Sequence, residues 1–106
     1  MTLRTLLLAG AATLALTGAA RAQADFETIT FADVGWTDIT ATTATATLIL
    51  EALGYGTETK LLSVPVTYSA MAEGDVDVFL GNWMPTMEAD LAPYRDAGTV
   101  EVLGTN

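Results

Sequence analysis

Residues 27–38 of the chain read ETITFADVGWTD, a strand-like stretch that stops at a glycine and gives way to a helical pattern. Polar and apolar residues alternate from 27 to 34, and the stretch is rich in Thr, Ile, Phe and Val, which favours a β-strand. Gly35 breaks this alternation. From 38 to 53 apolar residues return every three or four positions, which predicts an amphipathic helix. The opening of the fold is therefore predicted to be a strand, a glycine turn and a helix.

The predicted helix has clear ends but few strong helix formers. Thr37 or Asp38 can cap its start, and Gly54 stands where a glycine commonly follows a helix. Threonine, which has a low intrinsic helix propensity, is frequent along its length. We therefore expect packing against a sheet to stabilise this helix.

Strand and helix patterns continue to alternate along the rest of the chain. The expected elements are a strand at 57–64, a short helix at 66–73 opened by Pro65 and ended by Gly74, a strand at 76–80, a helix from Pro85 to about Tyr94, and a fourth strand at 100–103. This order predicts an α/β fold with a parallel sheet, flanking helices on both faces and right-handed crossovers. The strand at 76–80 is mostly apolar, so burial on both faces is expected. No further element follows the fourth strand, so we expect a truncated version of this architecture.

The N-terminus has the three parts of a secretory signal peptide. A short segment containing Arg4 precedes an apolar stretch at 6–16, and the small-x-small site AQA follows at 22–24. We expect a signal peptide at 1–24, cleavage after Ala24 and a periplasmic location. A membrane anchor would need about 20 apolar residues, about twice the length of this stretch. No later segment has the length and hydrophobicity to span a membrane, so no membrane insertion is expected after cleavage.

The composition restricts the partners and the chemistry. Residues 25–106 contain 13 acidic residues against Lys60 and Arg95, a formal charge of −11. Nucleic acid is an unsuitable partner for so acidic a chain, whereas a cationic ligand would be attracted; the same charge also serves solubility. The chain contains neither His nor Cys. A His-based catalytic site and a thiolate metal site are therefore excluded, and we expect no enzyme activity, no catalytic residue, no metal and no cofactor.

Two tryptophans follow predicted strands directly, and they are the main candidates for a binding site. Trp36 comes after the first strand and Trp83 after the third, each closely preceded by a glycine. Ligands of open α/β sheets bind outside the carboxyl ends of the strands. Aromatic faces attract quaternary ammonium groups, which have no N–H to donate. Asp38 could add a carboxylate beside the positive charge. Packing in the core or at its rim remains the alternative role for both tryptophans.

The two tryptophan motifs resemble those of a known family. GWTD at 35–38 and GNWMPT at 81–86, in this order and at this separation, are similar to the choline-binding subfamily of glycine-betaine-type ABC transporter substrate-binding proteins. The resemblance covers nearly all of 25–106 and implies the first lobe, in part, of a two-lobed periplasmic binding fold of type II. It also implies that Trp36 and Trp83 are two walls of an aromatic box, and that Asp38 faces the charge of the ligand.

The function expected from this resemblance is the binding of choline, or a related quaternary ammonium compound, for delivery to an ABC transporter permease. Two alternatives stay open, namely a fragment of a glycine betaine or proline betaine binding protein, and a truncated lobe with no binding function of its own. The three tyrosines, Tyr55, Tyr68 and Tyr94, are expected to pack or to lie at the surface. Asn82 is expected to serve the turn.

Overall fold

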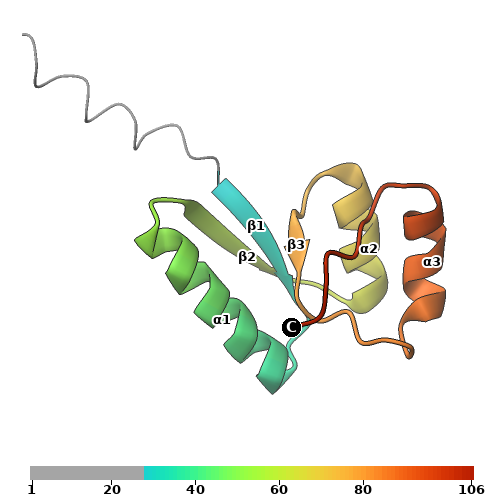
Figure 1. The fold of residues 1–106 in the computed structure, drawn as a ribbon, viewed down its shortest axis with the longest axis horizontal. Coiled ribbons are helices and arrows are strands. Elements are labelled where there is room, and N and C mark those ends of the chain that lie inside the picture. The colour runs from blue at the N-terminus through green and yellow to red at the C-terminus, as the bar shows by residue number, and fades with distance from the viewer. Residues whose placement is uncertain (1–27) are drawn as a thin grey trace, which may run out of the picture.

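The computed structural model describes residues 28–106. The predicted signal peptide and its cleavage site after Ala24 lie outside the described residues. Strands and helices alternate along the described part of the chain, as Figure 1 shows. The elements are β1 (Thr28–Asp33), α1 (Thr37–Ala52), β2 (Gly56–Leu61), α2 (Val64–Glu73), β3 (Val78–Phe79) and α3 (Glu88–Asp96).

The strands form one parallel sheet in the order β2-β1-β3, so the predicted α/β fold with a parallel sheet is confirmed. β1 is the central strand: it pairs with β2 from Thr28 opposite Gly56 onward and with β3 at Phe31 and Ala32. Phe31 and Ala32 are buried as a result. In Figure 1, α1 lies on one side of the sheet, while α2 and α3 lie on the other. This arrangement brings the carboxyl ends of β1 and β3 to the same edge.

Helix α1 begins one residue earlier than predicted and is not capped as predicted. Trp36, rather than Thr37 or Asp38, is the N-cap residue, and no side chain caps the helix. The Thr40 N–H donates to the Trp36 carbonyl at 2.8 Å, which is the first backbone bond of the helix. Only Ile39 and Thr43 of α1 are buried. Its contact with the sheet is therefore narrow.

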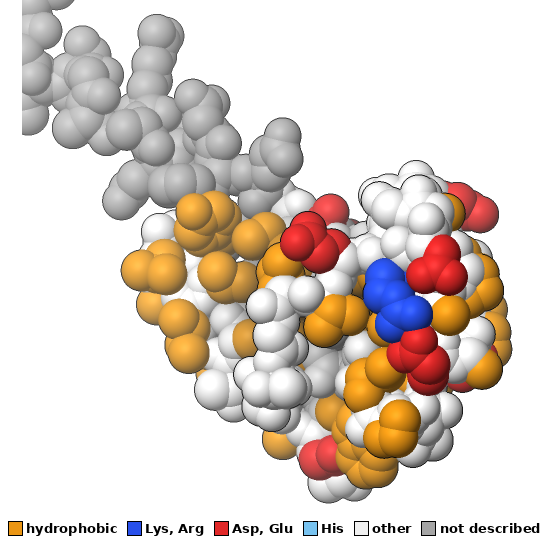
Figure 2. Space-filling view, turned by 45° about the vertical axis from the view of Figure 1, so that its right-hand side comes forward, with side chains coloured by type: hydrophobic (Ala, Val, Ile, Leu, Met, Phe, Trp, Pro, Cys, Tyr) orange, Lys and Arg blue, Asp and Glu red, His pale blue; other side chains and the backbone are white. Residues whose placement is uncertain are grey.

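The outer face of α1 is strongly apolar. Leu48, Ile49 and Leu53 are 66%, 58% and 63% exposed. Figure 2 shows hydrophobic side chains gathered over this helix, at the left of the view. Several helix threonines bond to the backbone of the preceding turn, for example the Thr42 hydroxyl to the Asp38 carbonyl at 2.9 Å. Such bonds satisfy the hydroxyls locally without adding helix stability.

Strand β3, Val78–Phe79, is shorter than the predicted strand at 76–80. Just before it, the Asp77 N–H donates to the Thr30 carbonyl of β1 at 2.8 Å. The Thr30 N–H donates in turn to the Asp77 side chain at 2.8 Å, in the place where a backbone carbonyl would continue the ladder. Val78 and Phe79 are half-buried, so the prediction that this strand is buried on both faces is wrong.

The C-terminal quarter differs most from the prediction. Pro85 lies in a turn, not in the first turn of a helix, and α3 begins at Glu88 and includes Pro93. The predicted strand at 100–103 is absent from the described residues. Val100 is buried. After it, the chain contacts the end of β3 through a side chain, because Asn106 Nδ2 donates to the Leu80 carbonyl at 3.0 Å. A side-chain contact of this kind makes no backbone ladder, so the sheet gains no strand.

The main core lies between β3, α2 and α3. Tyr68, Leu91 and Val100 form its centre, each at most 8% exposed. Four partly buried residues surround them: Val64, Met71, Phe79 and Tyr94. The Tyr68 ring packs edge-on against Phe79 and stacks on Tyr94, with centroid distances of 5.9 and 6.1 Å. The predicted packing role of Tyr68 and Tyr94 is therefore confirmed.

Candidate functional site

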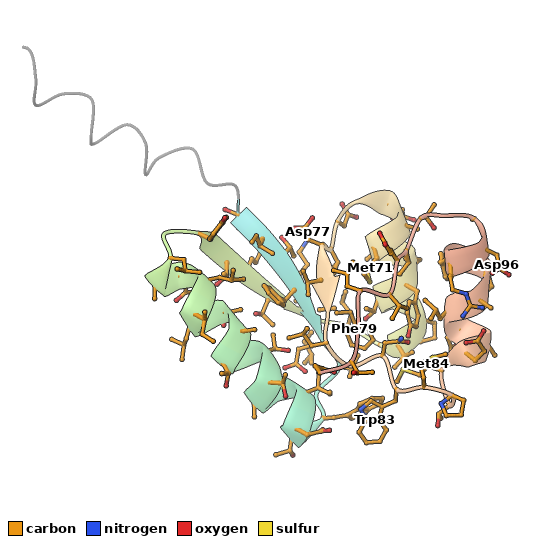
Figure 3. All side chains as sticks on the ribbon, in the orientation of Figure 1. Met71, Asp77, Phe79, Trp83, Met84 and Asp96 are labelled. Carbon is orange, nitrogen blue, oxygen red and sulfur yellow. The ribbon has the colours of Figure 1, made fainter. Side chains whose placement is uncertain are left out.

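The two sequence-predicted tryptophans meet at the carboxyl edge of the sheet. The centroids of the Trp36 and Trp83 rings are 5.5 Å apart, and their planes are inclined at 49°. Trp36 is 37% exposed and Trp83 is 53% exposed, so both present ring surface to solvent. Figure 3 shows Trp83 near the start of α1, at the opposite end of β3 from Asp77. The chain thus forms a solvent-facing pair of indoles from segments 47 residues apart in sequence.

The spacing of the rings limits how a ligand can sit. Centroids 5.5 Å apart mean that the two rings touch each other. A trimethylammonium group would therefore rest across the two inclined rings rather than between them. A cation within about 6 Å of a ring centroid experiences the cation–π attraction. The inclined pair allows one cation to approach both rings in this way.

The loop that carries Trp36 is fixed by residues on either side of it. Gly35 has a φ of +80°, a left-handed conformation that glycine adopts without steric cost. The carboxylate of Asp33, the last residue of β1, accepts a bond from the Gly35 N–H at 2.9 Å and one from the Thr40 hydroxyl at 2.8 Å. Asp33 was not among the residues predicted from the sequence. An Asp two residues before a Gly is a recognisable turn signal that could have identified it.

The loop that carries Trp83 is fixed by a buried methionine and a tyrosine. The Trp83 N–H donates to Met87 Sδ at 3.3 Å, and the Met87 N–H donates to the Trp83 carbonyl at 2.8 Å. The Tyr68 hydroxyl donates to Asn82 Oδ1 at 2.5 Å and lies 3.5 Å from Met87 Sδ. Burial, and secondarily the charge of Asp90, raises the pKa of Tyr68 to about 12. The hydroxyl therefore stays protonated at neutral pH and can donate to the loop.

Asp38, the predicted acidic member of the site, lies in the first turn of α1 and is exposed. Its carbonyl accepts the Thr42 hydroxyl. The structure thus places Asp38 two residues beyond Trp36 with its side chain toward water. Asn82 was expected to serve the turn, and its bond from Tyr68 gives it that role.

Both basic residues of the described chain are engaged away from the tryptophans. Lys60 Nζ donates to the Asp75 carbonyl at 3.2 Å. Arg95 forms a two-bond ion pair with Glu88, with Nη1 at 3.0 Å from Oε2, which lowers the pKa of Glu88. The bonds of these two cations are thus to residues outside the two tryptophan loops.

A groove of about 490 Å³ begins beside Trp83. On one side it is lined by core residues such as Tyr68, Met71 and Phe79, and on the other by the segment 100–106. Trp36 is not among its lining residues, so the groove and the tryptophan pair share only Trp83. Within 28–106 no cluster of three or more His, Cys, Asp and Glu side chains could hold a metal ion. In the same residues no helix has the length and hydrophobicity to cross a membrane.

Two solved structures are close to this chain. One is an ABC-transporter choline binding protein in complex with choline, 73% identical, with a TM-score of 0.66 over 67% of this chain and 25% of that chain. The other is an ABC-transporter choline binding protein in an unliganded semi-closed conformation, 70% identical, with a TM-score of 0.67 over 73% of this chain and 27% of that chain. The present chain thus spans about a quarter of each.

A curated protein of Chromohalobacter salexigens, called uncharacterized protein ORF1, is 53% identical over 78 residues. The match covers 74% of this chain and 50% of that protein, so the chain spans about half its length. Residues 27–106 match the family model OpuAC, the substrate binding domain of ABC-type glycine betaine transport systems. The resemblance that the two tryptophan motifs indicated is confirmed by these matches. The chain belongs to the family of substrate binding domains of ABC-type glycine betaine transport systems.

Proposed function

We propose that the chain binds choline, or a closely related quaternary ammonium compound, through the paired faces of Trp36 and Trp83. The observation that carries the proposal is the contact of these two exposed indoles, 5.5 Å apart, at the carboxyl edge of a parallel sheet. The names of the two solved relatives, both choline binding proteins, support the same ligand. Binding without turnover is the activity proposed.

The strength of binding by the pair can be estimated. Each ring contributes roughly 0.5–2 kcal/mol to a bound cation, so two rings supply about 1–4 kcal/mol before the cost of association. This corresponds to millimolar or weaker binding. Residues 28–106 on their own are therefore proposed to bind choline weakly. Within a longer protein, further groups would tighten the same site.

The electrostatics favour choline over a betaine. A betaine carries a carboxylate, which requires hydrogen-bond donors or a cation. Lys60 and Arg95 are both engaged elsewhere, whereas Asp38 lies exposed beside the Trp36 loop. A negative charge near the tryptophans attracts the ammonium group and repels a carboxylate. Glycine betaine or proline betaine is the second candidate ligand, supported by the description of the matching family.

The cellular role proposed is delivery of the bound compound to the permease of an ABC transporter from the periplasm. Membership of a transporter substrate-binding family supports this role. The signal peptide predicted at 1–24 would supply the export step.

A titration of the chain with choline, followed by tryptophan fluorescence, tests the proposal. The matched control is the neutral carbon isostere of choline, in which carbon replaces the quaternary nitrogen, so that shape is kept and charge is removed. Choline is expected to change the fluorescence saturably at millimolar concentrations, and the isostere is not. Equal responses to the two compounds, or none to choline, would contradict the proposal.

Substitutions at each tryptophan test whether the two rings themselves bind choline. Trp36→Leu and Trp83→Leu should each weaken choline binding roughly 2- to 30-fold, the range that one ring supplies. Trp36→Phe and Trp83→Phe keep an aromatic face and should lose less.

Asp38→Asn tests the contribution of the exposed carboxylate. It should weaken choline binding less than the loss of either ring, because water screens the charge. Its effect should fade as salt is added. A loss that persists at high salt would show that Asp38 contacts the ligand directly.

A further inference from the structure

The carboxylate of Asp33 is unusual among the acidic side chains of the described residues. Asp33 is 8% exposed, the one buried acidic residue between 28 and 106. No ion pair of the described residues includes it. Its two side-chain oxygens accept only neutral donors, the Gly35 N–H at 2.9 Å and the Thr40 hydroxyl at 2.8 Å. Burying a carboxylate costs free energy unless its hydrogen bonds are satisfied, so these two bonds are the reason that Asp33 is tolerated there.

The two bonds of Asp33 reach to either side of Trp36. Oδ1 accepts the N–H of Gly35, the residue before Trp36. The φ of +80° at Gly35 turns the chain out of β1. Oδ2 holds Thr40, whose own N–H donates to the Trp36 carbonyl at 2.8 Å. The Asp33 carbonyl is in turn fixed to β2 by the Leu62 N–H at 2.8 Å. Trp36 therefore sits in a closed loop whose ends are both tied to one buried side chain.

We propose that Asp33 is a positioning residue for Trp36: its carboxylate links the strand end to α1 and sets the orientation in which the Trp36 ring meets Trp83. Without the link, Gly35 and the first turn of α1 can move relative to β1, and the indole moves with them. The consequence for choline affinity rests on the proposed function, whereas the consequence for the geometry of the two rings does not.

Circular dichroism of the indole pair measures this geometry without a ligand. Two indoles in contact couple their electronic transitions, and the resulting couplet depends on the distance and angle between the rings. Trp83→Leu removes the partner ring and gives the baseline. Asp33→Leu keeps the approximate size of the side chain and removes both acceptor oxygens, so both bonds are lost. The couplet of Asp33→Leu is expected to fall toward the baseline, at a temperature where its helix signal equals that of the parent chain.

Thr40 supplies the matched pair of variants. Thr40→Ser keeps the hydroxyl and should keep the couplet, whereas Thr40→Val removes the bond to Asp33 and should reduce it. Choline titration of the same variants should show a rise in Kd within roughly 2- to 30-fold for Asp33→Leu and Thr40→Val, the range for loss of one ring. If Asp33→Leu does not fold, Thr40→Val decides.

The outcomes separate the two proposals. A reduced couplet in Asp33→Leu or Thr40→Val, with Thr40→Ser unchanged, supports the positioning role. It does so even where the parent chain shows no response to choline, a result that would contradict only the proposed function. A folded Asp33→Leu or Thr40→Val chain with the parent couplet and the parent choline affinity would overturn the positioning role. A merely structural Asp33 would lower the melting temperature and leave the couplet in place.

Discussion

Replacing Tyr68 by phenylalanine should reverse the order of stability between neutral and alkaline pH. Tyr68 is 1% exposed, and its ring contacts with Phe79 and Tyr94 do not involve the hydroxyl. Phenylalanine keeps those contacts and removes the bond to Asn82 Oδ1, which measures 2.5 Å. A net hydrogen bond of this kind contributes about 1 kcal/mol. At about pH 8, well below the ordinary tyrosine pKa, the variant should be less stable than the parent chain by about that amount.

At alkaline pH the difference in stability between the parent chain and Tyr68→Phe changes sign. Burial, with a smaller contribution from Asp90, raises the pKa of Tyr68 from 10.0 to about 12 in the folded chain. The unfolded chain therefore loses the phenolic proton first, so the stabilisation is complete below the unfolded pKa and is lost as the pH rises toward the folded pKa. At about 1.4 kcal/mol per pKa unit, the loss amounts to roughly 2–3 kcal/mol. Phenylalanine has no such proton to lose.

The two stability curves should therefore cross near about pH 11, above which Tyr68→Phe is the more stable chain. Urea unfolding, followed by circular dichroism at a series of pH values, measures the difference directly. Tyr94→Phe is the matched control, since it removes a hydroxyl from the ring stacked on Tyr68 and should leave the alkaline loss in place. If Tyr68→Phe lost stability as steeply as the parent chain between about pH 8 and 11, the alkaline loss would not come from Tyr68.

Two further substitutions test the packing. Leu91 is 1% exposed, so Leu91→Ala should cost about 2–5 kcal/mol in urea unfolding, whereas Leu48→Ala, at a position 66% exposed, should cost less than about 0.5. A Cβ at Gly81 would lie 2.8 Å from the ring of Phe79, so Gly81→Ala should cost about 1–3 kcal/mol and reduce the couplet of the indole pair. Gly104→Ala, with no atom within 4 Å of the added carbon, is its control. Equal costs within either pair would contradict the packing described here.

The alternation of strand and helix was predictable because hydrophobic periodicity is local. Each strand and helix between 28 and 96 was expected within a few residues of its observed bounds. The ends of α1 and α2 were also expected, because a glycine follows each helical pattern. Gly54 and Gly74 indeed have positive φ there. The parallel sheet followed from the order of the elements.

What failed to be predicted depends on contacts between distant segments. Before β3 the Asp77 carboxylate, rather than a backbone carbonyl, accepts the Thr30 N–H, and no pattern around Asp77 indicates that bond. Residues 100–103 have the composition of a strand, but pairing also requires a free and regular neighbour, and β3 offers only two residues. The Asp33 carboxylate joins the end of β1 to the Thr40 hydroxyl of α1, and the helical pattern of α1 does not indicate this bond.

The candidate site was predicted in part. The position of Trp36 and Trp83 after successive parallel strands indicated that they would share one edge, and the structure brings their rings together. The contact between the two rings, and the buried residues Met87 and Asp33 that bond to their loops, could not be predicted from the spacing of residues in the sequence. Met87 and Asp33 act on the site through bonds that appear only when the chain is folded.

The two indoles together are proposed to bind a quaternary ammonium group. Nuclear Overhauser effects between the N-methyl protons of choline and the indole protons test this contact itself, and they remain observable for weak binding. We predict effects to both Trp36 and Trp83, assigned with Trp36→Leu and Trp83→Leu, and none from the neutral isostere of choline. Choline that binds the chain without an effect to either indole would contradict the account.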